Sequence, residues 1–271
     1  TPIISLDVSQ NSLLTDLFLS VTPITSLDVS NNNLLTNVNI YATNLSCIQV
    51  NQWQLNNAVD SWVKDLGIVY SLDCSIAGKT FVPDNIFEQT LIDLGYDDIL
   101  DDYVLTSNIS SVTDLYLPTY DNIADLTGIE DFLALEFLGC EGNQLTSLNV
   151  SNNTALITLY CFDNQLTSLD ISNNTALTTL LCGGNQLSSL DLSQNTALTS
   201  LHCFENQLTS LDVSNNAALT ELWCDRNPYL PCIQVNQTQL DNIPLDWEKD
   251  LDAVYAIDCS IEGKTYVPDN N

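Results

Sequence analysis

The sequence predicts a repeat solenoid built mainly from short parallel β-strands, closed by small helical caps and arranged as two tandem modules. The first observation is a 21-residue period, at which cysteine recurs in five copies of one phrase: Cys140, Cys161, Cys182, Cys203 and Cys224. The second is a pattern, LxxLxΦxxN with Φ apolar, that fills both halves of each period. The third is a long repeat, in which residues 45–85 recur without a gap at 230–270. A fixed period of this kind indicates one supersecondary unit stacked on itself.

Each period predicts two short strands. In the unit 177–197 the halves are LTTLLCGGNQ and LSSLDLSQNTA. Leu180 and Cys182 alternate with other residues, and so do Leu190 and Leu192, so we expect both pairs to face the interior. Successive coils then stack at about 4.8 Å.

Asparagine recurs at the turn that follows each predicted strand. One column contains Asn143, Asn164, Asn185, Asn206 and Asn227, and the other contains Asn153, Asn174, Asn195 and Asn216. A buried asparagine can bond the free backbone groups of the turn beside it. The sequence therefore predicts two asparagine ladders.

Helices are expected at the ends of each stack, because an open end would expose apolar coil faces. Asp84 or Asn85 can cap a helix over IFEQTLIDL that ends at Gly95, with Phe87, Leu91 and Leu94 on its apolar stripe.

The closing cap shows helical spacing as well. Leu55, Val59, Trp62 and Leu66 are spaced for one helix face, with Gly67 as the stop. In the second copy Pro244 replaces Val59, so we expect that helix to start late, near Leu245.

The nine cysteines fall into two groups. Cys47/Cys74 and Cys232/Cys259 are each 27 residues apart within a closing cap, and we interpret them as disulfides rather than unrelated buried thiols. Closing such a loop contributes about 3.5 kcal/mol in the chain-entropy treatment. Disulfides imply an oxidising compartment, so we expect a secreted or cell-surface protein.

The five ladder cysteines are interpreted as packing residues rather than as a redox or metal site. Leu19, Ile40 and Leu117 occupy the same column elsewhere, and a thiolate metal site would not tolerate them. Stacked neighbours about 4.8 Å apart also exceed the usual Cβ separation of a disulfide, about 3.5–4.5 Å.

These motifs resemble the leucine-rich repeat family, in a 21-residue form with a nested half-repeat. The LTSLDVSNN and CxxNQ phrases are similar to arrays in secreted and surface proteins of flavobacteria-like bacteria. DNIADLTGIEDFLALEFL, residues 121–138, resembles an internalin-type first repeat. The resemblance implies a scaffold that hosts many different ligands.

The long repeat divides the chain into six expected segments. They are 1–44, the last coils of a first module; 45–81, its disulfide-stapled C-terminal cap; 82–108, the N-terminal helical cap of a second module; 109–229, its leucine-rich repeats; 230–265, its C-terminal cap; and 266–271, the start of a next module. We therefore expect neighbouring modules of the same parent chain.

Composition excludes several partners. The chain has 35 acidic and five basic side chains, a net charge of −30 over 271 residues. Five basic side chains cannot neutralise a run of phosphates, and we therefore expect no nucleic-acid partner. No apolar run approaches the roughly 20 residues of a membrane helix, so no membrane insertion is expected.

The repeats differ from one another mainly at the outward positions of the first strand. The second strand stays uniform, with Ser and Asp or Asn. The variable positions supply our candidate ligand-binding residues: Tyr160, Phe162, Leu181, His202, Phe204, Trp223, Glu205 and Asp225. Contiguous exposed aromatics usually mark a binding surface, although aromatics also pack well on half-exposed sheets.

The sequence contains no catalytic arrangement that we can identify. His202 is the only histidine, and its neighbour Cys203 should point inward, so no Cys–His dyad forms. Calcium is the one cofactor left open, at the acidic loop residues Asp97, Asp98, Asp101 and Asp102, although this loop lacks the rhythm of a calcium-binding loop.

The leading functional hypothesis is a non-enzymatic extracellular or cell-surface binding and adhesion module. Its variable aromatic and acidic face would recognise an extracellular protein or a glycan. The alternatives are a structural spacer in a tandem-repeat surface protein, and a binder of a regular surface such as ice or mineral.

Overall fold

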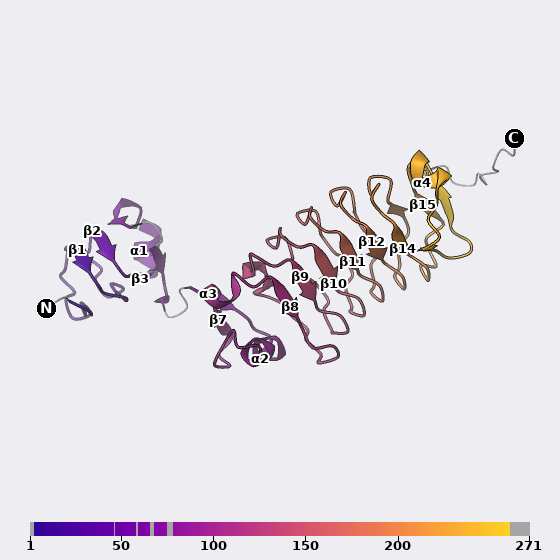
Figure 1. The fold of residues 1–271 in the computed structure, drawn as a ribbon. Helices are drawn as coiled ribbons and strands as arrows, with labels where there is room; N and C mark the ends of the chain where they lie inside the picture. The colour runs from indigo at the N-terminus through magenta and orange to yellow at the C-terminus, as the bar shows by residue number, and fades with distance from the viewer. Residues whose placement is uncertain (1–2, 46, 58, 66–67, 75–77, 261–271) are drawn as a thin grey trace, which may run out of the picture. The chain divides into compact units, whose positions relative to one another are not determined.

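The computed structural model describes residues 3–260 except 46, 58, 66–67 and 75–77. The chain divides into two compact units, Thr1–Lys79 and Thr80–Asn271. Each is a stack of coils in which short parallel strands lie side by side (Figure 1). The predicted repeat solenoid is therefore confirmed. The predicted segment 266–271 lies outside the described residues.

The second unit is built on one parallel sheet of seven strands. In spatial order these are β8 (Asp114–Tyr116), β9 (Phe137–Gly139), β10 (Thr158–Tyr160), β11 (Thr179–Leu181), β12 (Ser200–His202), β14 (Glu221–Trp223) and β16 (Trp247–Glu248). From β9 to β14, each strand is the first half of one 21-residue period. Equivalent positions pair directly, as Leu180 does with Leu201, so the sequence period becomes the spatial register.

The second half of each period differs from the prediction. A regular strand forms only at β13 (Leu211–Asp212), which joins β15 (Cys232–Gln234) and β17 (Val254–Ala256), and an isolated bridge links Asn149 to Asp170. Asp191 Oδ1 accepts a bond from Ser193 N at 2.9 Å, and Asp212 Oδ1 accepts one from Ser214 N at 2.9 Å within β13, so this turn is common to coils with and without a regular second strand. Leu190 and Leu192 still face the interior as predicted.

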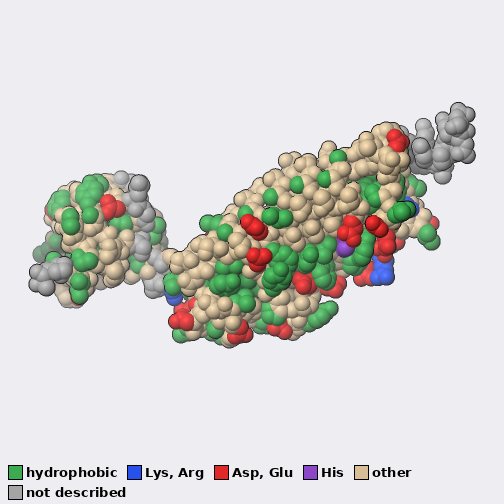
Figure 2. Space-filling view, viewed as in Figure 1, with side chains coloured by type: hydrophobic (Ala, Val, Ile, Leu, Met, Phe, Trp, Pro, Cys, Tyr) green, Lys and Arg blue, Asp and Glu red, His purple; other side chains and the backbone are tan. Residues whose placement is uncertain are grey.

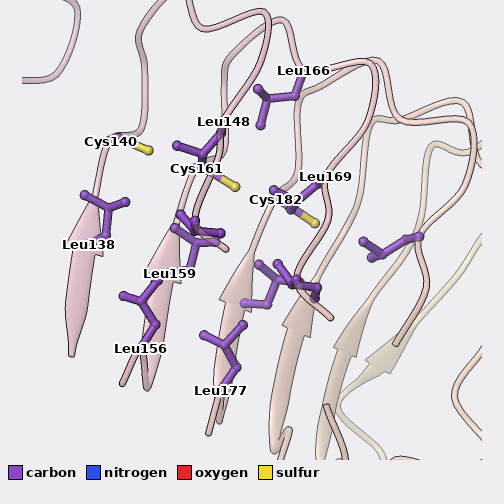
Figure 3. Packing of buried hydrophobic residues seen from close by; sticks show 14 of the residues in the cluster. Leu138, Cys140, Leu148, Leu156, Leu159, Cys161, Leu166, Leu169, Leu177 and Cys182 are labelled. Carbon is purple, nitrogen blue, oxygen red and sulfur yellow. The ribbon is translucent and has the colours of Figure 1, made fainter. Parts of the chain in front are cut away.

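The core of the second unit is a column of leucines with the cysteine ladder among them. Figure 3 shows Cys140, Cys161 and Cys182 in successive coils with their sulfur atoms directed to the same side. All five ladder cysteines are buried and unpaired. Burial raises the pKa of the Cys182 thiol to about 12. These residues are therefore packing groups that stay protonated at neutral pH.

We predict that the native protein resists thiol alkylation. At about pH 8 an ordinary cysteine is partly ionised, whereas burial keeps the ladder thiols protonated and unreachable. Intact-mass spectrometry after iodoacetamide should show no adduct in the native state and five in denaturant, rising to nine after reduction. Native labelling, or a disulfide between ladder positions, would contradict this assignment.

Both asparagine ladders form, and they use different bonds. In the first column Asn185 Oδ1 accepts from Leu166 N at 2.9 Å, and its Nδ2 donates to the carbonyls of Cys161 at 3.0 Å and Cys182 at 3.1 Å. In the second column Asn195 Nδ2 donates to Ile171 O at 3.0 Å. Each asparagine thus joins its own coil to the one before it.

Glutamine continues the second ladder into each closing cap. Gln239 Nε2 donates to the carbonyls of Val213 and Asn216, both at 3.1 Å. In the first unit Gln54 Nε2 bonds Val29 O in the same way, at 3.0 Å. The longer amide reaches back to the last coil from the first turn of the cap helix, and so joins the cap to the ladder.

The opening cap follows the prediction closely. Helix α2 (Asn85–Asp93) is capped by Asp84, whose Oδ1 accepts from Ile86 N and Phe87 N, and Phe87 and Leu91 are fully buried. Leu94, predicted on the same stripe, is instead 47% exposed, because the helix ends there.

Two strands and a short helix complete the opening cap. β6 (Lys79–Phe81) pairs with β7 (Tyr103–Leu105), which leads into α3 (Thr106–Ile109). Thr80 and Phe81, expected to end the first module, thus belong to the second unit.

The closing caps differ from the prediction. Helix α4 (Gln237–Asp241) precedes Pro244 instead of starting near Leu245, because Asn236 and Gln239 form a capping box that begins the helix early. Trp247 then lies in β16 rather than on a helix.

The first closing cap is similar. Helix α1 (Gln52–Asn57) is followed by a 3₁₀ turn, Val59–Ser61, and by β4 (Val63–Lys64), so the continuous helix predicted through Leu55 and Trp62 is wrong. The predicted stop at Gly67, with Leu66, lies outside the described residues.

The first unit has a three-stranded parallel sheet of β1 (Asp16–Thr22), β2 (Asn37–Thr43) and β4, and a pair formed by β3 (Cys47–Gln49) and β5 (Val69–Ser71). Both predicted disulfides are present: Cys47–Cys74 with Cα atoms 5.7 Å apart, and Cys232–Cys259 at 5.8 Å. Each staples a closing cap.

Candidate functional site

The candidate site is the outward side of the seven-stranded sheet in the second unit. Strand register places one residue from each coil in a single row: Tyr116, Gly139, Tyr160, Leu181, His202 and Trp223. Hydrophobic side chains gather along this face of the unit in Figure 2, with acidic side chains at its margins. Four of the predicted residues, Tyr160, Leu181, His202 and Trp223, therefore lie in this row.

Three aromatic rings interlock at the start of the row. Tyr116 and Phe137 stack with ring centroids 4.2 Å apart, and Phe137 meets Tyr160 edge-on at 5.1 Å. A Cβ atom at Gly139 would lie 3.1 Å from the Phe137 ring, so glycine there leaves the ring its place. Tyr116 is 63% exposed and is the most accessible ring of the three.

Tyr116 and Phe137 were not among the predicted site residues. Tyr116 precedes the regular array, and its strand lacks the CxxNQ phrase that identifies the outward positions in later coils. The pairing of Tyr116 with Gly139 reveals its place in the row. A signal was present, since Leu117 already matched the cysteine column and fixed Tyr116 as its outward neighbour.

A second group lies at the far end of the row. His202 and Trp223 stack face to face, with centroids 4.1 Å apart and planes 6° from parallel. Glu221 Oε1 lies 3.2 Å from His202 Nε2, and Ser200 Oγ donates to Glu221 Oε2 at 2.7 Å. The bond from Ser200, reinforced by His202, lowers the pKa of the Glu221 carboxyl. The His202 side chain is only 14% exposed, so it supports Trp223 rather than offering a free imidazole.

Phe162 and Phe204 lie two residues after Tyr160 and His202 in their coils. Gly183 holds the equivalent position in the coil between them. A Cβ at Gly183 would lie 2.7 Å from the Phe204 ring, so this ring rests over the glycine backbone. Both phenylalanines are half-buried, as are Tyr160 and Leu181. Together they extend the aromatic row sideways.

The acidic residues predicted beside this patch have a partner already. Arg226 forms ion pairs with Glu205 and, at 3.5 Å, with Asp225. The expectation that both carboxylates serve as free acceptors therefore needs correction, because both already pair with the same guanidinium. A signal was present in the sequence, since Arg226 lies one 21-residue period after Glu205 and directly follows Asp225.

The turns that follow these strands each contain a residue in the left-handed backbone conformation, and these residues form a column. Its φ angles are +66° at Gly142, +54° at Asp163, +61° at Gly184, +50° at Glu205 and +55° at Arg226. Glycine adopts this conformation freely and other residues rarely do. The turn therefore marks the end of the outward-facing segment in each coil.

The acidic loop is organised by a buried carboxylate. Glu88 is fully buried, and its Oε1 accepts from Asp101 N at 2.8 Å and from Tyr103 N at 3.2 Å. Among the described residues, no group of three or more His, Cys, Asp or Glu side chains is arranged to hold a metal ion. The calcium hypothesis for this loop gains no support from the geometry and stays a prediction.

In the part of the chain that the structure describes, no helix has the length and apolar character needed to cross a membrane.

Comparison with solved structures identifies leucine-rich repeat proteins. The chain is similar to the functional domain of InlJ from Listeria monocytogenes, which includes a cysteine ladder, at 34% identity over 58% of this chain and 38% of that one, with a TM-score of 0.50. It thus spans about two fifths of the length of that relative.

Two further matches are an internalin, InlF, from Listeria monocytogenes and the leucine-rich repeat protein LIC12759 from Leptospira interrogans. The first is 20% identical over 65% of this chain and 68% of that one, with a TM-score of 0.45. The second is 19% identical over 92% and 58%, with a TM-score of 0.46. No protein-family model and no curated protein matches the chain. These matches do not test the flavobacterial form of the repeat, which stays a prediction.

Proposed function

We propose that the second unit is the binding module of a secreted or cell-surface protein. Its aromatic row recognises a segment of another protein, or a glycan, at the outer face of the sheet. The observation that carries this proposal is the continuous row from Tyr116 to Trp223, which presents a ring in most coils of a rigid parallel sheet.

The packing of the rings supports recognition. Tyr116 and Trp223 each stack on a neighbour within the protein, so little conformational entropy is lost when a partner covers them. Tyr and Trp supply large contact areas with a polar edge, and they dominate the energy of many interfaces. The net charge of −30 favours a cationic partner and speeds its approach.

The disulfides and the open face support the remaining parts of the proposal. Two disulfides favour an oxidising, extracellular environment. A binding role without catalysis fits an open sheet face on which His202 is largely buried against Trp223 and the neighbouring Cys203 is buried.

The test is a double substitution, Tyr160→Ala with Trp223→Ala, in the full chain. Peptides selected from a phage-displayed random library, and glycans from an array, serve as probes. We expect peptides rich in Lys, Arg and aromatic residues, or a defined glycan class, whose affinity falls about 30-fold or more in the variant. Circular dichroism checks that the variant is folded.

The matched control is Ser189→Ala with Ser210→Ala, on the uniform side of the coils. It should leave the affinity unchanged. The proposal would be overturned if the aromatic variant bound its partner as tightly as the unchanged protein does. It would also be overturned if the library yielded no binder, which is the result that a passive spacer predicts. Loss of ice or mineral adsorption in the serine variant alone would favour the regular-surface alternative.

A further inference from the structure

A groove of about 440 Å³ lies beside the start of the aromatic row, between α2 and the first coil. Its apolar walls include Ile86, Leu94, Tyr116 and Pro118, and its charged residues are Asp93 and Asp121. Ile86, Leu94 and Tyr116 are all exposed. Tyr116 belongs both to this groove and to the row, where it stacks on Phe137. The groove is therefore continuous with the proposed binding face.

The two walls are held together by one side chain. Asp84 Oδ1 caps α2 through Ile86 N at 2.9 Å, and its Oδ2 accepts from Ala124 N at 2.8 Å and Asp125 N at 3.0 Å. A single carboxylate thus joins the start of the helix to the loop that follows Asp121. The groove is fixed by the fold and does not need a partner to form.

Further bonds position the acidic wall. Gln89 Nε2 donates to Asp93 Oδ1 at 2.9 Å, one turn further along α2. On the opposite wall Tyr120 N donates to Gly142 O at 2.7 Å, which holds the loop that carries Asp121. Asp93 and Asp121 are therefore held on preformed backbone.

Charge complementarity selects the occupant. Both charged residues of the groove are acidic, and no described lysine or arginine lines it. Arg226 and Lys249 lie at the other end of the unit, where Arg226 pairs with Glu205, and Lys249 Nζ donates to Asp250 O and lies 5.6 Å from the Tyr255 ring centroid. A cation in the groove must therefore come from outside the coils.

We propose that this groove holds an arginine side chain of a partner segment that lies along the aromatic row. The proposal rests on the proposed function and specifies the chemistry of the partner. The methylene stem packs on Ile86 and Leu94, and the planar guanidinium stacks on Tyr116 while donating to Asp93 or Asp121. Lysine fits less well, because its ammonium cannot stack or bind in a bidentate manner.

The test is a titration of the full chain with N-acetyl-arginine methylamide, followed by amide chemical shifts in two-dimensional NMR. We expect saturable shifts at Gln89, Asp93 and Tyr116, and none with the neutral analogue N-acetyl-citrulline methylamide. The pair Asp93→Asn and Asp121→Asn should weaken binding about fivefold or more. The matched control, Asp98→Asn with Asp102→Asn, removes the same charge from the acidic loop and should leave the affinity unchanged.

Three outcomes would overturn the proposal: equal shifts with citrulline, shifts that spread over the surface without saturation, or equal weakening by both pairs of substitutions. Tyr160→Ala with Trp223→Ala separates this proposal from the proposed function, because arginine binding in the groove should survive that change. If peptides fail to depend on the row while arginine still binds, the proposed function fails alone. If the row binds peptides without any preference for arginine, the groove proposal fails alone.

Discussion

Replacing Asn185 with alanine should lower the free energy of unfolding by about 3 kcal/mol. The Asn185 side chain holds four backbone groups, because it also donates to Gly183 O at 3.2 Å. The carbonyls keep other donors after the change: Cys161 O keeps Asn164 and Cys182 O keeps Asn206. Leu166 N has no such second partner and would be left as a buried donor without an acceptor.

The second ladder supplies a matched comparison. Asn195 is more deeply buried, but it only donates, and its acceptors Ile171 O and Asn174 O keep the backbone bonds from Asn174 N and Leu177 N. Asn195→Ala should therefore cost about half as much as Asn185→Ala, because no backbone group is orphaned. Asn173→Ala, an exposed residue with one bond to Ser151 O, should cost less than about 1 kcal/mol.

Urea unfolding followed by circular dichroism measures these differences, and hydrogen exchange of the Leu166 amide tests their cause. That amide should lose its protection in Asn185→Ala and keep it in Asn195→Ala. Equal costs for the two ladder substitutions would contradict the argument, since they would mean that burial alone sets the penalty. Loss of protection in both variants would contradict it as well.

The 21-residue period predicted the structural features that every coil repeats. Every copy of a period-21 position meets the same neighbours, so the inward leucines, the cysteine column and both asparagine columns could be assigned from spacing alone. The outward row followed by alternation, since Tyr160 and His202 flank cysteines that must point inward. These features depend on local geometry that each coil repeats.

What escaped prediction lies mainly outside the regular 21-residue phrases. In the second unit the second half of the coil forms a regular strand at Leu211–Asp212, where it pairs with a strand of the closing cap. The capping box of Asn236 and Gln239 outweighs the apolar spacing that suggested a later helix. Tyr116 joins the row from a strand outside the regular array. Arg226, by contrast, lies one period after Glu205, so the spacing already placed this ion pair in neighbouring coils. The capping box and Tyr116 lie where the 21-residue phrases end or have not yet begun, so the period supplies no template for them.

Removing the two disulfides should have unequal effects, although both close loops with a sequence separation of 27 residues. The chain-entropy contribution is about 3.5 kcal/mol in each case. In the first unit Cys47–Cys74 supports a small separate core, so this amount is a large part of the total stability. In the second unit Cys232–Cys259 staples only the last coil and cap of a much longer stack.

We therefore expect Cys47→Ser with Cys74→Ser to lower the melting temperature of the first unit by about 15 °C. Cys232→Ser with Cys259→Ser should move the main transition of the second unit by only about 3 °C, because a stack can fray at its end without unfolding throughout. Differential scanning calorimetry of the full chain resolves the two transitions, and hydrogen exchange should place the new opening of the second variant at 230–260. Equal shifts in the melting temperatures of the two units would contradict this expectation. They would mean that the second unit unfolds as one cooperative block, in which the closing cap stabilises the coils of the aromatic row as much as those coils stabilise one another.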